Sequence, residues 1–125
     1  MATKLILFPF EVGKSFITYN CITIPKKYHK ELEDGGFVRL SGDRKTEIKI
    51  NSLKYNRDID GHIYYGQAGY GWYYQIRISQ SRPTDYFGHF KKLERILVAM
   101  GKKEGKTYVT LFDNIEERMK LAGLL

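Results

Sequence analysis

Hydrophobic and polar residues alternate along much of this chain, and the alternation predicts a mainly β protein. A strand with one buried face repeats every two residues, because successive side chains point to opposite sides. Seven segments fit this pattern: 3–10, 17–24, 37–40, 46–53, 62–67, 72–79 and 107–112. Clusters of Gly, Asp or Asn separate most of them, and this spacing favours a barrel or a sandwich.

Helices are expected to be few and short. Pro25 can occupy the first turn of a helix over the following KKYHKEL, in which Tyr28 and Leu32 form a buried stripe. A second helix is predicted over 89–100 and a third over 115–121. The second is predicted from apolar residues at helical spacing, before Gly101 ends it: Phe90, Leu93, Leu97 and Met100.

The most informative segment is 61–80, GHIYYGQAGYGWYYQIRISQ. It joins two strand-like runs through a glycine-rich tip, and it contains five tyrosines, the only tryptophan and no acidic residue. Alternation predicts one packed face with Trp72, Tyr74, Ile76 and Ile78, and one outward face with Tyr73, Gln75, Arg77 and Ser79. The outward face combines rings, an amide and a guanidinium, which suit base edges and phosphates. Aromatic residues are also ordinary strand formers, so an amphipathic hairpin without such a role stays open.

Length and charge narrow the class of protein. The 125 residues fit a single domain over 1–125, and the net charge of +7 favours a polyanionic partner such as nucleic acid. The single cysteine, Cys21, cannot form an intramolecular disulfide and fits a reducing compartment. No apolar run approaches the roughly 18 residues that span a bilayer, and no signal peptide is evident. We therefore expect a cytoplasmic protein with no membrane partner.

The strongest catalytic candidate is a set of Asp34, Glu47 and Lys49. Metal-dependent nucleases pair a distant Asp with an E-x-K strand to hold magnesium and orient water. Glu47 and Lys49 are equally explained as the polar half of a strand whose other half is Ile48 and Ile50. The histidines show no metal-ligand spacing: His29, His62 and His89. We therefore expect no catalytic residue, no metal and no cofactor.

Basic residues gather at the fronts of the first two predicted helices, where backbone N–H groups can also meet phosphates. We expect phosphate contacts from four of them: Lys26, Lys27, Lys91 and Lys92. Any one lysine is more simply explained as solvated surface. The expectation therefore depends on their combination with the hairpin and the polar segment 11–20.

The order of these parts resembles the DNA-binding pseudobarrel shared by plant B-three transcription factors and the effector domains of EcoRII-type restriction endonucleases. The resemblance covers most of the chain. It is carried by IPKK at 24–27, by IYYGQAGYG at 63–71, and by 90–111, which looks like the family's second helix, basic turn (102–105) and closing strand. It implies a seven-stranded open pseudobarrel with two or three short α-helices, which grips the major groove of double-stranded DNA with two arms.

The resemblance also implies which residues bind DNA. The N-terminal arm would be 11–20, with Lys14, Ser15, Thr18, Tyr19 and Asn20 as DNA-binding residues. The C-terminal arm would be 67–79, with Gln67, Tyr70, Tyr73, Gln75, Arg77 and Ser79. The hairpin tip is shorter and carries fewer charges than in the restriction-enzyme branch.

We therefore expect a non-enzymatic, sequence-specific DNA-binding module, the target-recognition domain of a restriction endonuclease whose nuclease domain is covalently linked or separate. Three alternatives stay open. One is the nuclease through Asp34, Glu47 and Lys49. Another is a swapped-hairpin regulator of the AbrB kind, which 18–27 also resembles, although those domains are much shorter. The third is an RNA-binding barrel that stacks bases on Tyr64, Tyr65, Tyr70 and Trp72.

Overall fold

The computed structural model of the chain describes residues 5–13, 16, 21–38, 45–52, 58–69, 71–79, 93–112 and 123. These residues form seven strands and one short helical segment. The strands are β1 (Ile6–Glu11), β2 (Cys21–Thr23), β3 (Lys45–Ser52), β4 (Ile59–Ala68), β5 (Gly71–Ile78), β6 (Arg95–Lys103) and β7 (Lys106–Phe112). Between β2 and β3, the 3-10 helix η1 (Lys26–Tyr28) leads into the α-helix α2 (His29–Asp34).

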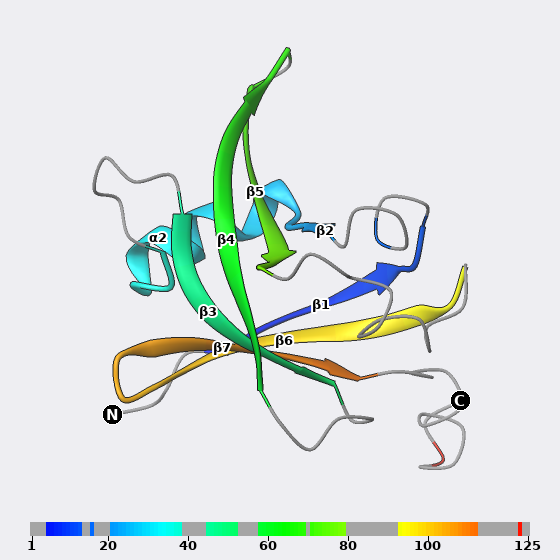
Figure 1. Cartoon of the computed structure of the whole chain (residues 1–125). Coiled ribbons are helices and arrows are strands. Elements are labelled where there is room, and N and C mark those ends of the chain that lie inside the picture. The colour runs from blue at the N-terminus through cyan, green and yellow to red at the C-terminus, as the bar shows by residue number, and fades with distance from the viewer. Residues whose placement is uncertain are drawn as a thin grey trace.

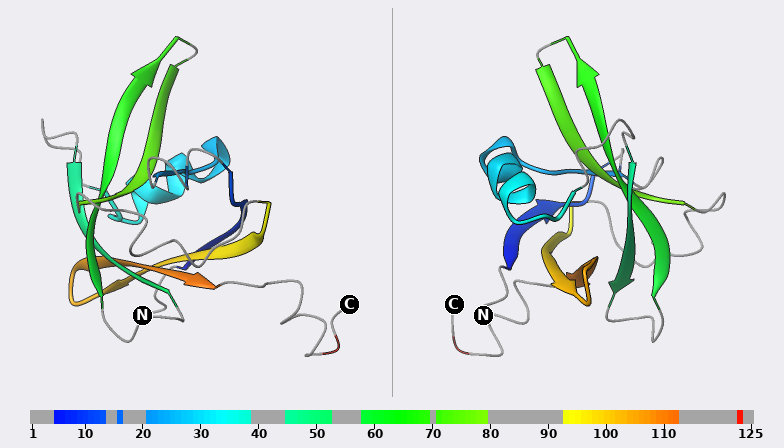
Figure 2. Two further views of the ribbon diagram at one scale, coloured as in Figure 1. Left: turned by 45° about the vertical axis from the view of Figure 1, so that its right-hand side comes forward. Right: turned by 90° about the vertical axis from the view of Figure 1, so that its left-hand side faces the viewer.

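The seven strands belong to one sheet in the order β1-β6-β7-β3-β4-β5-β2. Neighbours are antiparallel, except that β3 and β7 run parallel. The sheet curls so that β1, β6 and β7 cross below β3, β4 and β5, and it forms a nearly closed barrel (Figure 1, Figure 2). The expected mainly β, seven-stranded open pseudobarrel is thus confirmed.

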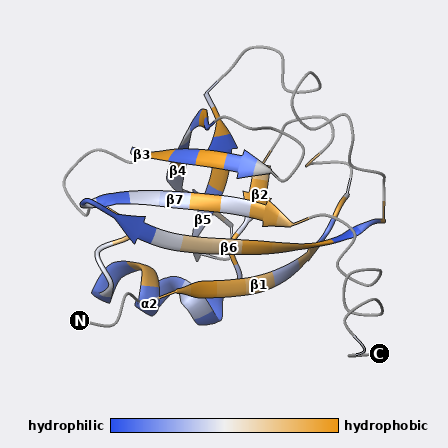
Figure 3. Ribbon diagram, turned by 90° about the horizontal axis from the view of Figure 1, so that it is seen from below, coloured by the Kyte–Doolittle hydropathy of each residue, from blue (hydrophilic) through white to orange (hydrophobic). Residues whose placement is uncertain are grey.

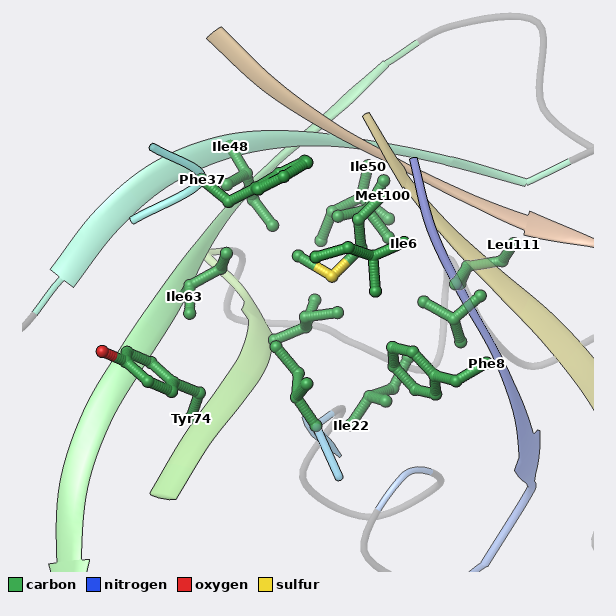
Figure 4. Close-up of a cluster of buried hydrophobic side chains, with 14 of the residues drawn as sticks. Ile6, Phe8, Ile22, Phe37, Ile48, Ile50, Ile63, Tyr74, Met100 and Leu111 are labelled. Atoms are coloured by element: carbon green, nitrogen blue, oxygen red, sulfur yellow. The ribbon is translucent and has the colours of Figure 1, made fainter. Parts of the chain in front are cut away.

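The barrel interior is filled by every second side chain of the strands, because alternate side chains point inward. On β6, for example, Ile96, Val98 and Met100 are fully buried, while the residues between them are half-buried. Bands of hydrophilic and hydrophobic residues alternate in the same way along β3 (Figure 3). Figure 4 shows the converging side chains, among them Ile6, Phe8, Ile22, Phe37, Ile48, Ile50, Ile63, Tyr74, Met100 and Leu111. Removal of this apolar surface from water is the main favourable term in folding.

The helical segment α2 packs on the barrel through Leu32, which is fully buried, as the sequence predicted for this short helix. After α2 the chain turns at Gly36, whose φ of 72° favours glycine, and then buries Phe37. Two side chains of the β6–β7 hairpin hold this turn. Thr107 Oγ1 donates to the Phe37 carbonyl at 2.9 Å, and Lys102 Nζ donates to the Gly36 carbonyl at 2.9 Å.

The helix predicted over 89–100 is wrong wherever the structure describes it, because residues 95–100 begin β6. This segment carries apolar residues at helical spacing and also at a spacing of two. Burial follows the spacing of two, and Leu93, expected on the buried helix face, is 66% exposed. As a strand the segment pairs with both β1 and β7, and these tertiary interactions outweigh a weak helix propensity.

Other expectations differ in part. Phe37 and Val38 are buried but do not form a strand, and 39–40 lie outside the described residues. Of the strand predicted over 17–24, residues 21–24 are described, and they consist of β2 and Ile24. The helix predicted over 115–121 lies outside the described residues. The closing strand is confirmed as β7, whereas the basic turn expected over 102–105 is shorter, because Lys102 and Lys103 end β6 and the chain turns at Glu104 and Gly105. Within the described ranges, no helix is long and apolar enough to cross a membrane.

Gly61 on β4 generates a stability prediction. A Cβ at Gly61 would overlap Ile50 Cδ1 and would lie 2.8 Å from the Arg77 carbonyl oxygen, which belongs to the sheet backbone. Gly61→Ala should therefore lower the free energy of unfolding by about 1–3 kcal/mol in urea denaturation. Gly69→Ala is the matched control, because no atom of the described residues, its chain neighbours aside, lies within 4 Å of a Cβ at Gly69. Equal stability of the two variants would show that β3, β4 and β5 do not pack this closely.

Candidate nucleic-acid interface

The β4–β5 hairpin rises far above the rest of the barrel (Figure 1, Figure 2). Its two strands pair continuously from Gly61 opposite Ile78 to Ala68 opposite Gly71. Gly71 has a φ of 129°, a conformation that L side chains rarely adopt. The glycine-rich tip is therefore the turn of a hairpin, as the sequence predicted.

The alternation predicted for β5 is confirmed. On the inner side, Tyr74 and Ile76 are buried at 2% exposure each, and Ile78 is half-buried. Trp72 has the same parity, but it lies near the tip and is 39% exposed. The outward side carries Tyr73, Gln75 and Arg77, all half-buried. The pleat thus anchors β5 on one side and presents polar groups on the other.

Arg77 is held in place by its neighbours on the outward side. Its Nε and Nη2 donate to Gln75 Oε1 at 3.0 and 2.7 Å, and its guanidinium lies 4.1 Å from the centre of the Tyr64 ring. Gln75 in turn donates from Nε2 to Thr23 Oγ1 at 3.1 Å. A cation over an aromatic ring and two hydrogen bonds to one oxygen fix the plane of the guanidinium.

This arrangement leaves a specific set of donors. A guanidinium has five N–H groups, and Gln75 accepts from the edge formed by Nε and Nη2. The opposite end, formed by Nη1 and the second hydrogen of Nη2, has the geometry that donates to two acceptors at once. The paired N–H donors at this end of the Arg77 guanidinium are therefore oriented before any ligand binds.

Two tyrosines extend this surface toward the tip. The rings of Tyr64 and Tyr73 lie 6.2 Å apart and tilted at 50°. Gly66 makes room for them, because a Cβ there would overlap Tyr64 and would lie 2.8 Å from the Tyr73 ring. We call the outward surface formed by Thr23, Tyr64, Tyr73, Gln75 and Arg77 the Arg77 face.

The inner side of the hairpin carries a column of stacked aromatic rings. Tyr65 lies 4.5 Å from Tyr74 in a stacked geometry and 4.7 Å from Trp72, and His29 meets Tyr74 edge-on. The Tyr74 hydroxyl donates to Glu33 Oε1 at 2.9 Å, and burial, with the Glu33 carboxylate, raises the pKa of Tyr74. The column joins the hairpin to α2 through His29 and Glu33, so the hairpin is braced rather than isolated.

The predicted phosphate contacts Lys26 and Lys27 lie on η1, and both are exposed. The Lys26 ammonium lies 3.8 Å from the position that a Cβ at Gly71 would take, so it stands beside the hairpin tip. Lys27 Nζ lies 5.1 Å from the centre of the Tyr28 ring. The structure thus brings Lys26 close to the C-terminal arm, and Lys27 is its neighbour on η1.

Several predicted site residues fall outside the described ranges. They are Lys14, Ser15, Thr18, Tyr19 and Asn20 of the N-terminal arm, Tyr70 of the C-terminal arm, and Lys91 and Lys92. Of the remaining C-terminal arm, Gln67 is exposed on β4 opposite Trp72. Ser79 follows β5, and its hydroxyl lies 3.1 Å from His62 Nδ1.

Lys49, the lysine of the nuclease alternative, has another partner. Lys49 Nζ donates a hydrogen bond to Asp60, its register partner on β4, and this contact raises the pKa of Lys49 and lowers that of Asp60. Ile48 and Ile50 are buried, as the alternating-strand interpretation expects. Among the described residues, no three His, Cys, Asp or Glu side chains are grouped so that they could hold a metal ion.

Sequence reasoning does not place Thr23, His62 or Tyr64 beside Arg77, and it names Tyr64 only as a base-stacking ring of the RNA-binding alternative. Counting back from the hairpin tip would have found two of them, because Ala68 opposite Gly71 places Tyr64 opposite Gln75 and His62 opposite Arg77. Thr23 comes from β2, which pairs with β5 across a long separation in sequence. No local signal indicates that register.

Comparison with known proteins adds one likeness of fold. No family model and no curated protein matches the chain. A chain in the solved structure "Arabidopsis FUS3-DNA complex" superposes with a TM-score of 0.57, covering 83% of this chain and 93% of that chain, at 14% sequence identity. The fold is a B-three-like pseudobarrel. At this level of identity the likeness concerns the fold alone.

The electrostatics of the site generate a second prediction. Burial, and then the positive charges of Lys45 and Arg77, lower the pKa of His62 below its ordinary value of 6.5. Arg77→Gln removes one charge and should raise the pKa of His62, as measured by NMR of the imidazole protons. Because the folded pKa is the lower one, this group stabilises the fold fully above pH 6.5 and less as pH falls through that value. An unchanged pKa in Arg77→Gln would contradict the closeness of the two side chains.

Proposed function

We propose that this chain binds double-stranded DNA sequence-specifically, with the Arg77 face turned toward the major groove. The observation that carries the proposal is the Gln75–Arg77 pair on an anchored strand. Guanine presents O6 and N7 acceptors in the major groove, and the end of a guanidinium can donate to both. Because Gln75 and Tyr64 already orient Arg77, little ordering entropy is lost when it meets a base.

Further features favour duplex DNA as the partner. The net charge is +7, and Lys26 stands beside the hairpin tip, within reach of a phosphate backbone along the Arg77 face, with Lys27 next to it on η1. The similar fold described above belongs to a structure titled as a DNA complex. We propose that the N-terminal arm, through Lys14, Ser15, Thr18, Tyr19 and Asn20, grips the duplex from the other side.

We also propose that the chain is the effector domain of a restriction endonuclease of the EcoRII kind and works in the cytoplasm. The support is the hairpin start IYYGQAGYG at 63–71, which is similar to that branch of the family. In this proposal the chain itself does not hydrolyse DNA. A nuclease domain, covalently linked or separate, does so after the target has been recognised.

The packing of the rings argues against the RNA-binding alternative. Open ring faces are what a single-stranded base needs for stacking. Tyr64 already carries the Arg77 guanidinium, and Tyr65 is in contact with both Trp72 and Tyr74. The protein's own side chains therefore use much of the stacking surface.

Competition between duplex DNA, single-stranded DNA and RNA of equal length tests this point, and we expect the duplex to bind tightest.

Affinity for duplex DNA should fall steeply as salt rises. Each neutralised phosphate releases counterions and contributes about −0.9 to the slope of log affinity against log salt. Replacing Lys26 and Lys27 together by Ala should weaken all sequences alike and should reduce the slope by roughly two contacts' worth, about 1.8. Lys49→Ala is a single-charge control, to be compared with Lys26→Ala and Lys27→Ala taken singly, because Lys49 is bound to Asp60. An affinity for duplex DNA that does not change with salt concentration would contradict the assignment of these lysines to phosphate contacts.

Arg77 should determine one base pair of the recognised site. Arg77→Ala should cost about 1–3 kcal/mol at that position and should relax its preference when bound duplexes are selected from a random pool. Arg77→Lys keeps the charge without the paired N–H donors, so it should relax the same position while it retains non-specific binding. If Arg77→Lys selects the same sites as the original protein, Arg77 contacts a phosphate and not a base.

A further inference from the structure

A pocket of about 830 Å³ opens beside the Arg77 face, and two hydrogen bonds already described belong to its lining, His62 with Ser79 and Thr107 with the Phe37 carbonyl. One wall comes from β3, β4 and the end of β5, and the other from the β6–β7 turn and the turn after α2. Its described lining residues are Gly36, Phe37, Lys45, Thr46, Glu47, His62, Ser79, Gly105, Lys106 and Thr107. In the sheet register Lys45 lies opposite Tyr64, and His62 lies opposite Arg77. The pocket is therefore a lateral extension of the proposed interface.

The lining of the pocket suits an anion with several acceptor oxygens. Lys45 and Lys106 are exposed, and they approach the pocket from opposite walls. The turn end of β6 and β7, from which Lys106 comes, is hydrophilic (Figure 3). Glu47 is the one acidic residue in the described lining. Two ammonium groups outweigh one carboxylate, and a protonated His62 would add a third positive charge.

His62 is placed to gain and lose a proton without losing its hydrogen bond. Its Nδ1 lies 3.1 Å from Ser79 Oγ. A serine hydroxyl can donate to a neutral ring nitrogen, and it can rotate to accept from a protonated one. In the neutral ring with Nδ1 as acceptor, Nε2 carries the hydrogen; in the charged ring both nitrogens are donors. Ser79 therefore orients His62 in either state.

We infer that this pocket receives a phosphate diester of the bound duplex, held by Lys45, Lys106 and a protonated His62. The inference rests on the proposed binding of duplex DNA and extends the footprint across β4 to β3. A charged imidazole N–H donating to a phosphate oxygen is a strong, charge-assisted hydrogen bond. The phosphate would neutralise the positive charges that now face His62, so the ring would take up a proton as DNA binds.

The charges around His62 make this proton uptake measurable. In the described part of the chain, the charged groups around His62 are Lys45 and Glu47 on β3, Arg77 on β5 and Lys106 in the pocket lining. Asp60 lies two residues before His62 on β4, and it is bound by Lys49. Burial and the positive neighbours keep the pKa of His62 low without a ligand. A phosphate reverses that effect, so affinity should rise as pH falls.

The test is the affinity for one selected duplex at a series of pH values from 5.5 to 8 and constant ionic strength. We expect binding to tighten several-fold toward low pH, and by at most about tenfold per pH unit because one proton is involved. His62→Gln should bind with little pH dependence. His29→Gln should keep the original dependence, because His29 packs against Tyr74 on the inner side.

The outcomes separate this inference from the proposed function. Binding without pH dependence, or an unaltered dependence in His62→Gln, would overturn the phosphate contact while duplex binding stands. Absence of binding at every pH would overturn both. A second test uses a series of duplexes, each with one neutral methylphosphonate at a different backbone position. We expect the pH dependence of binding to disappear for one of these positions only. If inorganic phosphate alone raises the pKa of His62 in NMR as far as the duplex does, the pocket is a site for free anions and not for the DNA backbone.

Discussion

The pairing of β5 between β4 and β2 is the constraint on which the rest of the site depends. In a strand, burying Tyr74 and Ile76 forces Gln75 and Arg77 to point outward, and a slip of one residue would exchange the two sets. The pairing with β4 brings Tyr64 under Arg77, and the pairing with β2 brings Thr23 to Gln75. The two strands of one hairpin and the distant strand β2 thus contribute to one rigid polar surface.

The hairpin can project from the barrel because its inner side is braced. The column from Trp72 through Tyr65 to Tyr74 ends on α2, where Glu33 accepts the Tyr74 hydroxyl hydrogen bond. A two-stranded ribbon without such support is only marginally stable in water. Lys26, on the helical segment that leads into α2, lies beside the tip, so the base-directed and phosphate-directed groups are close together. This preorganisation favours specificity, because fewer side chains must be ordered on binding.

The sequence predicted what local periodicity controls and missed what distant pairing controls. The hairpin, the two faces of β5 and the short helix with Leu32 inside follow from spacing along a few residues. Residues 95–100 satisfy helix and strand spacing together, and only the pairing with β1 and β7 decides for a strand. The contact of His62 with Ser79 likewise depends on the β4–β5 register. The predicted N-terminal arm lies mostly outside the described residues.

The central claim is that duplex DNA lies against the Arg77 face. NMR titration of the protein with a selected duplex tests it most directly, because every backbone amide and many side-chain N–H groups report separately. The account predicts the largest shifts at Thr23, Gln75 and the Arg77 guanidinium, and small shifts at Leu97 and Thr110, which line a different, apolar groove over β6 and β7. Large shifts at Leu97 and Thr110 with an unperturbed Arg77 would contradict it.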